Sequence, residues 1–397
     1  MSCYHPLKGF PVGLTANGKT DYKITSYDVK AIMFRYHPTS GAKMFDEIRE
    51  NSTATYSFPW RRVDEFVEIP CGHCIGCRLQ KSRDWANRMM LEAQEHENNW
   101  FLTLTYNDKH LPVANDLHPE NGDYVDEFFN EETGEYMYKS PLRPLVLRDL
   151  QLFLKRLRKQ QKKDFNNEIR YYACGEYGSI NHRPHYHLII FGLKLDDIYQ
   201  DGMNKRGEKY FKSPTIEELW TNSLEKSQDI PTYYKNEKGE KDYTKPGCAI
   251  GFHCLAPVTW ETCAYTARYV TKKQYGKNAK IYESLGIPPE FATMSRRPGL
   301  ARNFYDENKN KIYDTDELFI NLGLKGSIKA KPPRYFDQLY DIDNPDECAI
   351  LKDNRREIAE QLAKVKENLT SLSYLDQLQV EETVKLERTK ILQRKDL

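Results

Sequence analysis

The chain has 397 residues, of which 39 % are hydrophobic and 29 % are charged, and its 59 Lys and Arg balance 58 Asp and Glu to a net charge of +1. The 27 Tyr and 17 Phe are too many for a disordered chain, and the 21 Gly have no fixed period, which excludes a collagen-like protein. A neutral total gives no sign of nucleic-acid binding, although a total hides how charge is distributed along the chain.

Residues 1–98 form a predicted N-terminal segment that is irregular up to residue 70, because Gly, Pro and Asn interrupt it. Its first residues contain no apolar core of a secretion signal, and no apolar run approaches the roughly 20 residues of a membrane span. We therefore expect a cytoplasmic protein with no membrane partner. Trp85, Met89 and Glu92 are spaced as on one helix face and predict a helix over residues 82–97.

Three of the nine cysteines are spaced C-x-x-C-x-x-C, at Cys71, Cys74 and Cys77. Without a secretion signal, metal ligation or free thiols are favoured over disulfides. Zinc sites usually have four ligands, and Cys3 is the natural fourth for a structural Zn²⁺ that would staple the N-terminal segment. Three reduced thiols in a turn are the alternative, and an iron–sulfur cluster also fits the spacing.

A central domain is predicted over residues 99–310, and it begins with alternating β-formers that indicate a strand at 100–106. Residues 111–138 then contain eight Asp and Glu and no Lys or Arg, between turn signals typical of a hairpin insertion. This acidic insertion is either a solvated surface hairpin or an arm that mimics DNA.

The next segment has the opposite charge. Leu150, Phe153 and Leu157 share one face of a predicted helix at 146–163, and six Lys and Arg at 155–163 cover much of the remainder. Residues 266–302 add eight Lys and Arg against two Glu. The neutral total is therefore an average over opposed segments, and it does not argue against DNA.

Further elements are predicted along the rest of the domain. They are strands at 168–174, 185–192 and 249–255, a loop at 176–184, a short helix at 215–222, and a helix capped by Thr259 that runs to about residue 274.

His185 and His187 alternate along the second of these strands, so both imidazoles lie on one face. Two imidazoles on a rigid face can hold a divalent ion and leave positions open for a phosphate oxygen. Glu176, near the end of the neighbouring strand, would add the hard ligand that Mg²⁺ or Mn²⁺ prefers. By themselves, the histidines are equally compatible with two ordinary strand residues.

Tyr265, Tyr269 and Lys272 are spaced i, i+4 and i+7, which places them on one helix face. Tyrosine can act as a covalent nucleophile, and a nearby cation lowers its pKa and stabilises the charge that develops on a reacting phosphate. The alternative is a plain amphipathic core face, against which the charge of Lys272 argues.

Taken together, these motifs resemble the HUH rolling-circle replication initiators. Within them the chain is most similar to those of the microviruses, small single-stranded DNA bacteriophages, and especially their gokushovirus branch. The resemblance covers residues 1–337, and the flanking segments that support it are Pro70–Cys74, Gly175–Gly178, Met294–Pro298 and Pro333–Tyr335.

The resemblance implies an enzyme that nicks and rejoins single-stranded origin DNA. A tyrosine forms a 5′-phosphotyrosine, the free 3′-OH is extended by a host polymerase, and a host helicase is an expected partner. His185 and His187 match the metal motif, Tyr265 and Tyr269 match the nucleophiles, and Lys272 matches the motif lysine. Glu176 as third ligand is instead our inference from the strand geometry. The implied fold is α+β, an antiparallel sheet with a ferredoxin- or RRM-like core, a cysteine-rich N-terminal extension and a helical tail.

Basic and aromatic side chains outside the proposed centre are expected to follow phosphates and stack on bases. The candidate DNA contacts are Arg156, Lys159, Arg268, Lys273, Arg296, Arg297, Arg302, Arg334 and Tyr335. Two readings compete with the nickase, a zinc-stapled DNA-binding protein without catalysis and an HUH transposase or relaxase.

After a short extension at 311–345, residues 346–397 form a predicted helical tail. An apolar seam runs along it, with residues four and three apart. The seam consists of Ile358, Leu362, Val365, Leu369 and Leu372. It predicts docking on the protein's own domain, with a dimeric coiled coil as the alternative.

Overall fold

The computed structural model describes residues 3–112, 126–130, 135–139, 143–178, 183–204, 207–236, 238–239, 241–242, 247–269, 280, 282 and 287–390. The chain divides into two compact units, residues 81–354 and residues 1–80 together with 355–397. These bounds differ from those of the four predicted segments, whose division stays a prediction.

The larger unit is built on a seven-stranded antiparallel sheet with the strand order β12-β13-β16-β7-β11-β10-β17. Its strands are β7 (Trp100–Thr105), β10 (Arg170–Tyr177), β11 (Pro184–Phe191), β12 (Tyr199–Met203), β13 (Lys209–Lys212), β16 (His253–Pro257) and β17 (Phe291–Met294). The predicted α+β class and the predicted first strand are confirmed.

Two of the predicted elements in this sheet are wrong in their bounds. The loop expected at 176–184 is shorter, because Glu176 pairs with His185 and Tyr177 with Pro184 at the end of the ladder. The strand expected at 249–255 begins only at His253, while Ala249 forms an isolated bridge with Thr221. In both places, turn-forming Gly and Pro stand close to or inside regular strands, so the sequence pattern misplaces the ends.

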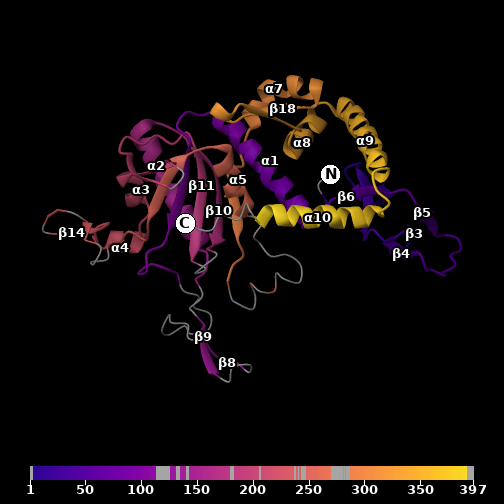
Figure 1. Cartoon of the computed structure of the whole chain (residues 1–397), viewed down its shortest axis with the longest axis horizontal. Coiled ribbons are helices and arrows are strands. Elements are labelled where there is room, and N and C mark those ends of the chain that lie inside the picture. Colours follow the sequence, from indigo (N-terminus) through magenta and orange to yellow (C-terminus); the bar gives the residue numbers. More distant parts are fainter. Residues whose placement is uncertain are drawn as a thin grey trace. The chain divides into compact units, whose positions relative to one another are not determined.

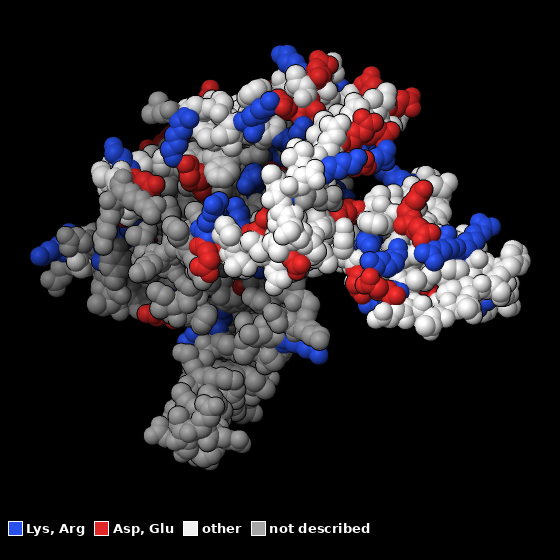
Figure 2. All heavy atoms as spheres, turned by 45° about the vertical axis from the view of Figure 1, so that its right-hand side comes forward, with Lys and Arg blue, Asp and Glu red and all other residues white. Residues whose placement is uncertain are grey.

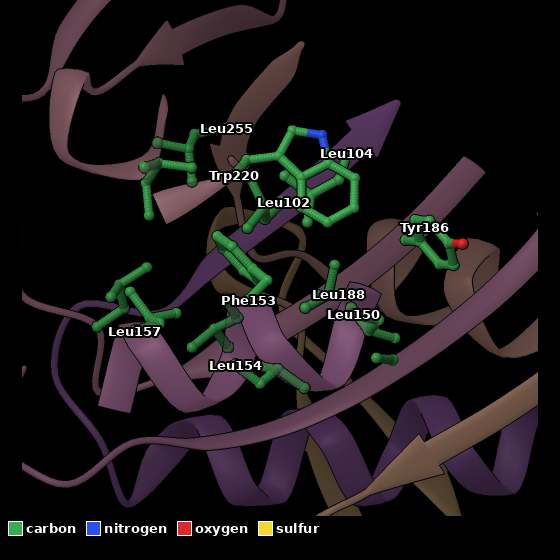
Figure 3. Packing of buried hydrophobic residues seen from close by; sticks show 14 of the residues in the cluster. Leu102, Leu104, Leu150, Phe153, Leu154, Leu157, Tyr186, Leu188, Trp220 and Leu255 are labelled. Atoms are coloured by element: carbon green, nitrogen blue, oxygen red, sulfur yellow. The ribbon is translucent and has the colours of Figure 1, made fainter. Parts of the chain in front are cut away.

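One face of the sheet is covered by α2 (Leu147–Phe165) and α3 (Pro214–Leu219), close to the predicted helices. Phe153 and Leu157 of α2 pack with Leu102 and Leu188, which lie on this face of the central strands (Figure 3). Trp220, fully buried, closes the same cluster. Burying each such side chain contributes roughly 1.5–3 kcal/mol, so this layer is the main core of the unit.

The opposite face is covered by α1 (Ile75–Gln94) and α5 (Trp260–Tyr269), as Figure 1 shows beside β10 and β11. Met89 and Cys263 pack there against Ile189 and Phe191, residues of β11 that alternate with those of the other face. Helix α1 begins seven residues before the predicted start. The predicted cap of α5 is confirmed, because the Thr259 hydroxyl accepts the N–H of Thr262 at 3.2 Å, whereas its expected continuation to residue 274 lies outside the described residues.

Further elements complete the larger unit. They are α4 (Ser223–Ser227), the hairpins β8 (Asp126–Asn130) with β9 (Glu135–Lys139) and β14 (Tyr234–Lys235) with β15 (Lys241–Asp242), and the series α7 (Arg302–Thr315), β18 (Leu318–Asn321), η2 (Gly323–Lys325), β19 (Ser327–Ala330) and α8 (Arg334–Asp343). The β8–β9 pair confirms the hairpin predicted in the acidic insertion. Tyr305, Ile320 and Phe336 form the core of the last series.

The expectation that residues 1–70 are irregular is wrong. They form two antiparallel sheets with the orders β2-β1-β6 and β4-β3-β5. The strands are β1 (Leu7–Leu14), β2 (Thr20–Thr25), β3 (Ala31–Tyr36), β4 (Lys43–Ile48), β5 (Arg61–Val63) and β6 (Val67–Ile69). Gly9, Pro11 and Gly13 lie inside β1 and resemble turn signals, yet Phe10 beside them is fully buried with Ile32 and other apolar residues.

The tail consists of α9 (Pro345–Glu367) and α10 (Tyr374–Lys390). The predicted docking of its seam is wrong, since the five seam residues are 46–77 % exposed and the last two lie beyond the end of α9. Helix α10 packs instead through Leu378, which is buried, and Tyr374, whose hydroxyl donates to Glu68 at 3.1 Å.

Charged side chains of both signs are interspersed over the face seen in Figure 2, and no large field of one sign covers the described residues visible there. Among the helices of the described part of the chain, none is both long and apolar enough to cross a membrane.

Candidate functional site

Polar side chains from three neighbouring strands meet on the sheet face that α5 covers. In the strand register His187 lies opposite Thr103 of β7, and His185 lies opposite Glu176 of β10. Side chains opposite one another on adjacent strands share a face. The structure therefore brings together the three residues predicted as metal ligands, together with a threonine that the sequence analysis did not select.

His187 has a partner at each ring nitrogen. Its Nε2 lies 2.8 Å from Oε1 of Glu176, and its Nδ1 lies 3.0 Å from the hydroxyl of Thr103. An ionised carboxylate only accepts hydrogen bonds, so Nε2 carries a proton, and in the neutral ring Nδ1 accepts from Thr103. Both His187 and Glu176 are buried, so this geometry is fixed by packing as well as by hydrogen bonds.

His185 completes the group. Its ring is nearly parallel to that of His187, with an angle of 8° and a centroid separation of 6.5 Å. Two imidazole nitrogens and one carboxylate oxygen are a donor set that divalent ions accept, so the residue types fit a metal. In the described residues, however, only four cysteines have ligand atoms all within 4.8 Å of one another. Metal binding at the histidines would require Nε2 of His187 to lose the proton that it shares with Glu176.

Tyr265 of α5 lies over this group. Its ring centroid is 5.3 Å from that of His187 and 6.1 Å from that of Phe101 on β7, both in edge-on contacts. Strand order explains the position, because the chain leaves β16 on one side of β7 and rejoins the sheet at β17, beyond β10. Tyr269 ends α5, one helical turn after Tyr265. The side chain of Tyr269, and Lys272 and Lys273 altogether, lie outside the described residues.

The four cysteines of the predicted zinc site are also brought together, in the smaller unit. Cys3, Cys71, Cys74 and Cys77 have Sγ atoms that all lie within 4.8 Å of one another, and Cys3 and Cys74 are buried. Each of the four is a free thiol in the structure.

The basic residues of α2 lie on the opposite face of the sheet from Tyr265. Arg156 is engaged within the fold, since its Nε donates to the Leu219 carbonyl at 2.9 Å and its Nη1 to the Ser223 hydroxyl at 2.8 Å. Lys159 is exposed. Neither residue is brought to the histidine strand, and Arg156 contributes to packing between α2 and α3.

Arg296 and Arg297 are exposed in the turn after β17. Glu92, a buried residue that the sequence analysis used only as a helix marker, anchors the chain just beyond this turn. It forms an ion pair with Arg170, whose Nη2 donates to the Pro298 carbonyl at 2.8 Å, and it accepts the N–H of Ala301. Burial opposes ionisation, but the bonds from His96, the Ala301 N–H and Arg170 prevail and lower the pKa of Glu92.

The remaining candidate contacts are divided between surface and packing positions. Arg334 is exposed and Arg268 is half-buried on α5. Arg302 pairs with Asp306 one turn along α7. The ring of Tyr335 lies 4.1 Å from the guanidinium of Arg88, which makes it part of the packing beneath the 296–301 turn.

Comparisons with known proteins agree with the arrangement on this sheet. The family model described as replication-associated protein ORF2 matches residues 99–274, the segment that holds the histidine strand and α5. The chain is 31 % identical to the replication-associated protein ORF2 of Spiroplasma virus 4 over 78 % of its length and 80 % of that protein. It is 26 % identical to the replication-associated protein VP4 of Bdellovibrio phage phiMH2K over 74 % of its length and 75 % of that protein.

A third similarity, to the replication-associated protein ORF4 of Chlamydia phage 1, is 28 % identical over 41 % of this chain and 34 % of that protein. No solved structure matches. The fold and the relatives define a phage replication protein. The chain belongs to the family of replication-associated proteins of gokushovirus-like microviruses, and it is a replication initiator of that type.

Proposed function

We propose that the protein initiates rolling-circle replication by nicking single-stranded origin DNA, with Tyr265 or Tyr269 as the nucleophile. The observation that carries the proposal is the position of Tyr265, whose ring lies 5.3 Å from the imidazole of His187 on a face that also holds His185 and Glu176. A phenol beside two imidazoles and a carboxylate is the set of groups that phosphodiester transesterification needs. The antiparallel sheet under them is then the ferredoxin- or RRM-like HUH core.

In the proposed reaction the tyrosine Oη bonds to phosphorus and the bond from phosphorus to the 3′-oxygen breaks. The phenol loses its proton, the 3′-oxygen gains one, and the 5′-phosphate remains joined to the enzyme. Since one phosphoester replaces another, a later attack by a 3′-OH can release the tyrosine and join the strand without ATP. Mg²⁺ or Mn²⁺ held by His185, His187 and Glu176 would supply a Lewis acid for the scissile phosphate.

Thr103 and Glu176 have positioning roles in this proposal. Together they fix the ring plane and the tautomer of His187, one through Nδ1 and the other through Nε2. The exposed Arg296, Arg297 and Arg334 would contact the DNA backbone, as would Lys159, Arg268 and Lys273, while a polymerase and a helicase of the host would act on the nicked product in the bacterial cytoplasm.

The test is formation of a covalent adduct. Full-length protein is mixed with Mn²⁺ and labelled single-stranded oligonucleotides that tile the phage genome, and the products are separated on a denaturing gel. We expect one oligonucleotide to yield a labelled protein band. Tyr265→Phe and Tyr269→Phe should each reduce the band and the double variant should abolish it, whereas the control Tyr171→Phe, on the opposite sheet face, should retain it.

An adduct that persists in the double variant would refute the tyrosine mechanism. A wild-type protein that binds the oligonucleotides but never forms an adduct would instead favour the non-catalytic DNA-binding protein. The names of the relatives, all replication-associated, favour replication over a transposase or relaxase.

A further inference from the structure

We propose that Cys3, Cys71, Cys74 and Cys77 bind one structural zinc ion that ties the N-terminus of the chain to the start of α1. This inference concerns the smaller unit and is independent of the nicking reaction. Its first support is geometric, because the four Sγ atoms all lie within 4.8 Å of one another. In a tetrahedral site with Zn–S bonds of about 2.3 Å, neighbouring sulfurs are about 3.8 Å apart, so the four side chains need only a small inward movement.

The second support is the set of backbone N–H groups directed at these sulfurs. The N–H groups of Cys71, Cys74 and Tyr4 each point at a sulfur, in that order Cys3, Cys71 and Cys74, with N···S distances of 3.3 Å. The N–H of Cys77 approaches Cys74 Sγ at 3.5 Å. Four thiolates around Zn²⁺ carry a net charge of −2, and N–H donors of this kind stabilise that charge and orient the ligands. Three thiols in a turn, without a metal, would not need a fourth thiol from a segment 68 residues away in sequence.

The third support is what the cluster would hold in place. The segment around Cys3 precedes β1 and belongs to no strand, and His5 beside it lies 2.6 Å from Glu382 of α10 through its Nε2. Helix α10 in turn reaches Glu68, just before the cysteine loop, through Tyr374. The buried cluster centred on Phe10 in this unit is small, and small units of this kind commonly rely on a metal or disulfide staple.

Zinc would therefore link three segments that are distant in sequence, the N-terminus, the loop at 70–77 and, through His5, helix α10. Metal loss is expected to release the N-terminus first and then to weaken the docking of α10. The chemical class favours zinc over Mg²⁺ because thiolates are soft ligands, and the four-sulfur set matches closed structural sites that leave no coordination position for substrate.

Metal content of full-length protein purified without chelator is the direct test, with zinc and iron measured per chain. We expect one zinc in the wild type, and a large loss of zinc in Cys3→Ser and in Cys71→Ser. The matched control is Cys348→Ser, which also removes a buried thiol but lies outside the cluster. Cobalt-loaded wild-type protein should show the intense thiolate charge-transfer absorption of a tetrathiolate site.

A second measurement applies even if the cysteine variants fold poorly. Zinc is released from wild-type protein with a chelator, and amide hydrogen exchange is followed before release, after release and after zinc is returned. We expect faster exchange at residues 3–5 and in α10 after release, and recovery when zinc is added back. Iron with acid-labile sulfide, absence of stoichiometric zinc, or equal zinc in Cys71→Ser and Cys348→Ser would overturn the proposal.

Discussion

Protonation of His253 is expected to destabilise the protein as the pH falls from 6.5 to 4. His253 lies on β16 with 7 % of its surface exposed, and its Nε2 accepts the backbone N–H of Ser213, the N-cap of α3, at 2.9 Å. Burial, with smaller effects of Lys212 and Lys241, lowers the pKa of His253 to about 4. A proton on Nε2 would also remove the acceptor for Ser213.

The sign and size of the effect follow from linkage. The unfolded chain binds this proton with an ordinary pKa of about 6.5, so protonation begins in the unfolded state and draws the equilibrium toward it. The full loss below the folded pKa of about 4 is about 3 kcal/mol, at roughly 1.4 kcal/mol for each pKa unit, and about 2 kcal/mol of it is reached by pH 5. Above pH 7 the group has no effect on stability.

Urea denaturation at pH 7.5 and at pH 5 measures the effect. In His253→Gln the amide oxygen can still accept the Ser213 N–H, and the difference in unfolding free energy between the two pH values should shrink by about 2 kcal/mol relative to wild type. The control His37→Gln removes an exposed histidine of the other unit and should leave that difference unchanged. If His253→Gln keeps the full pH dependence of the wild type, His253 is not the group that titrates.

Three further outcomes are expected. Glu92→Gln leaves Arg170 without its charge partner and should lower the unfolding free energy by about 3 kcal/mol in urea denaturation, whereas exposed Glu95→Gln should change it by less than about 0.5 kcal/mol. Thr103→Val should slow nicking roughly tenfold with unchanged affinity for single-stranded DNA, and an unchanged rate would exclude its positioning role. Replacing the eight Asp and Glu of residues 111–138 by Asn and Gln should tighten non-specific DNA binding and alter its dependence on salt, and unchanged binding would make the insertion a solvated hairpin.

Much of the candidate site could be predicted from the sequence, because its residues lie in regular elements of strong periodicity. Alternation along β11 was sufficient to place His185 and His187 on one face, and the helical spacing of α5 placed Tyr265 on a face with Tyr269. The spacing of the cysteines also predicted which thiols would meet. Glu176 was predicted as a ligand, although the sequence pattern located it in a loop rather than in β10.

What could not be predicted depends on contacts between distant segments. Thr103 is important only because β7 pairs with β11, and a threonine in a strand has no signal of its own. Glu92 resembles any polar residue of a helix until Arg170 and the turn at 296–301 fold against it. The strands of residues 1–70 were missed because β1 contains Gly and Pro, whose turn tendency is overridden by burial of Phe10.

The strand order has a consequence for synthesis of the protein. By the time Phe191 has left the ribosome, the chain contains β11 with both of its neighbours, β7 and β10, and so all three proposed metal ligands. Helix α5 is made later, and the chain that follows it returns to the sheet only when β17 pairs with β10. An incomplete chain that stops before α5 therefore carries the ligands without a tyrosine nucleophile, and under the proposed mechanism it would be unable to cut the phage genome that encodes it.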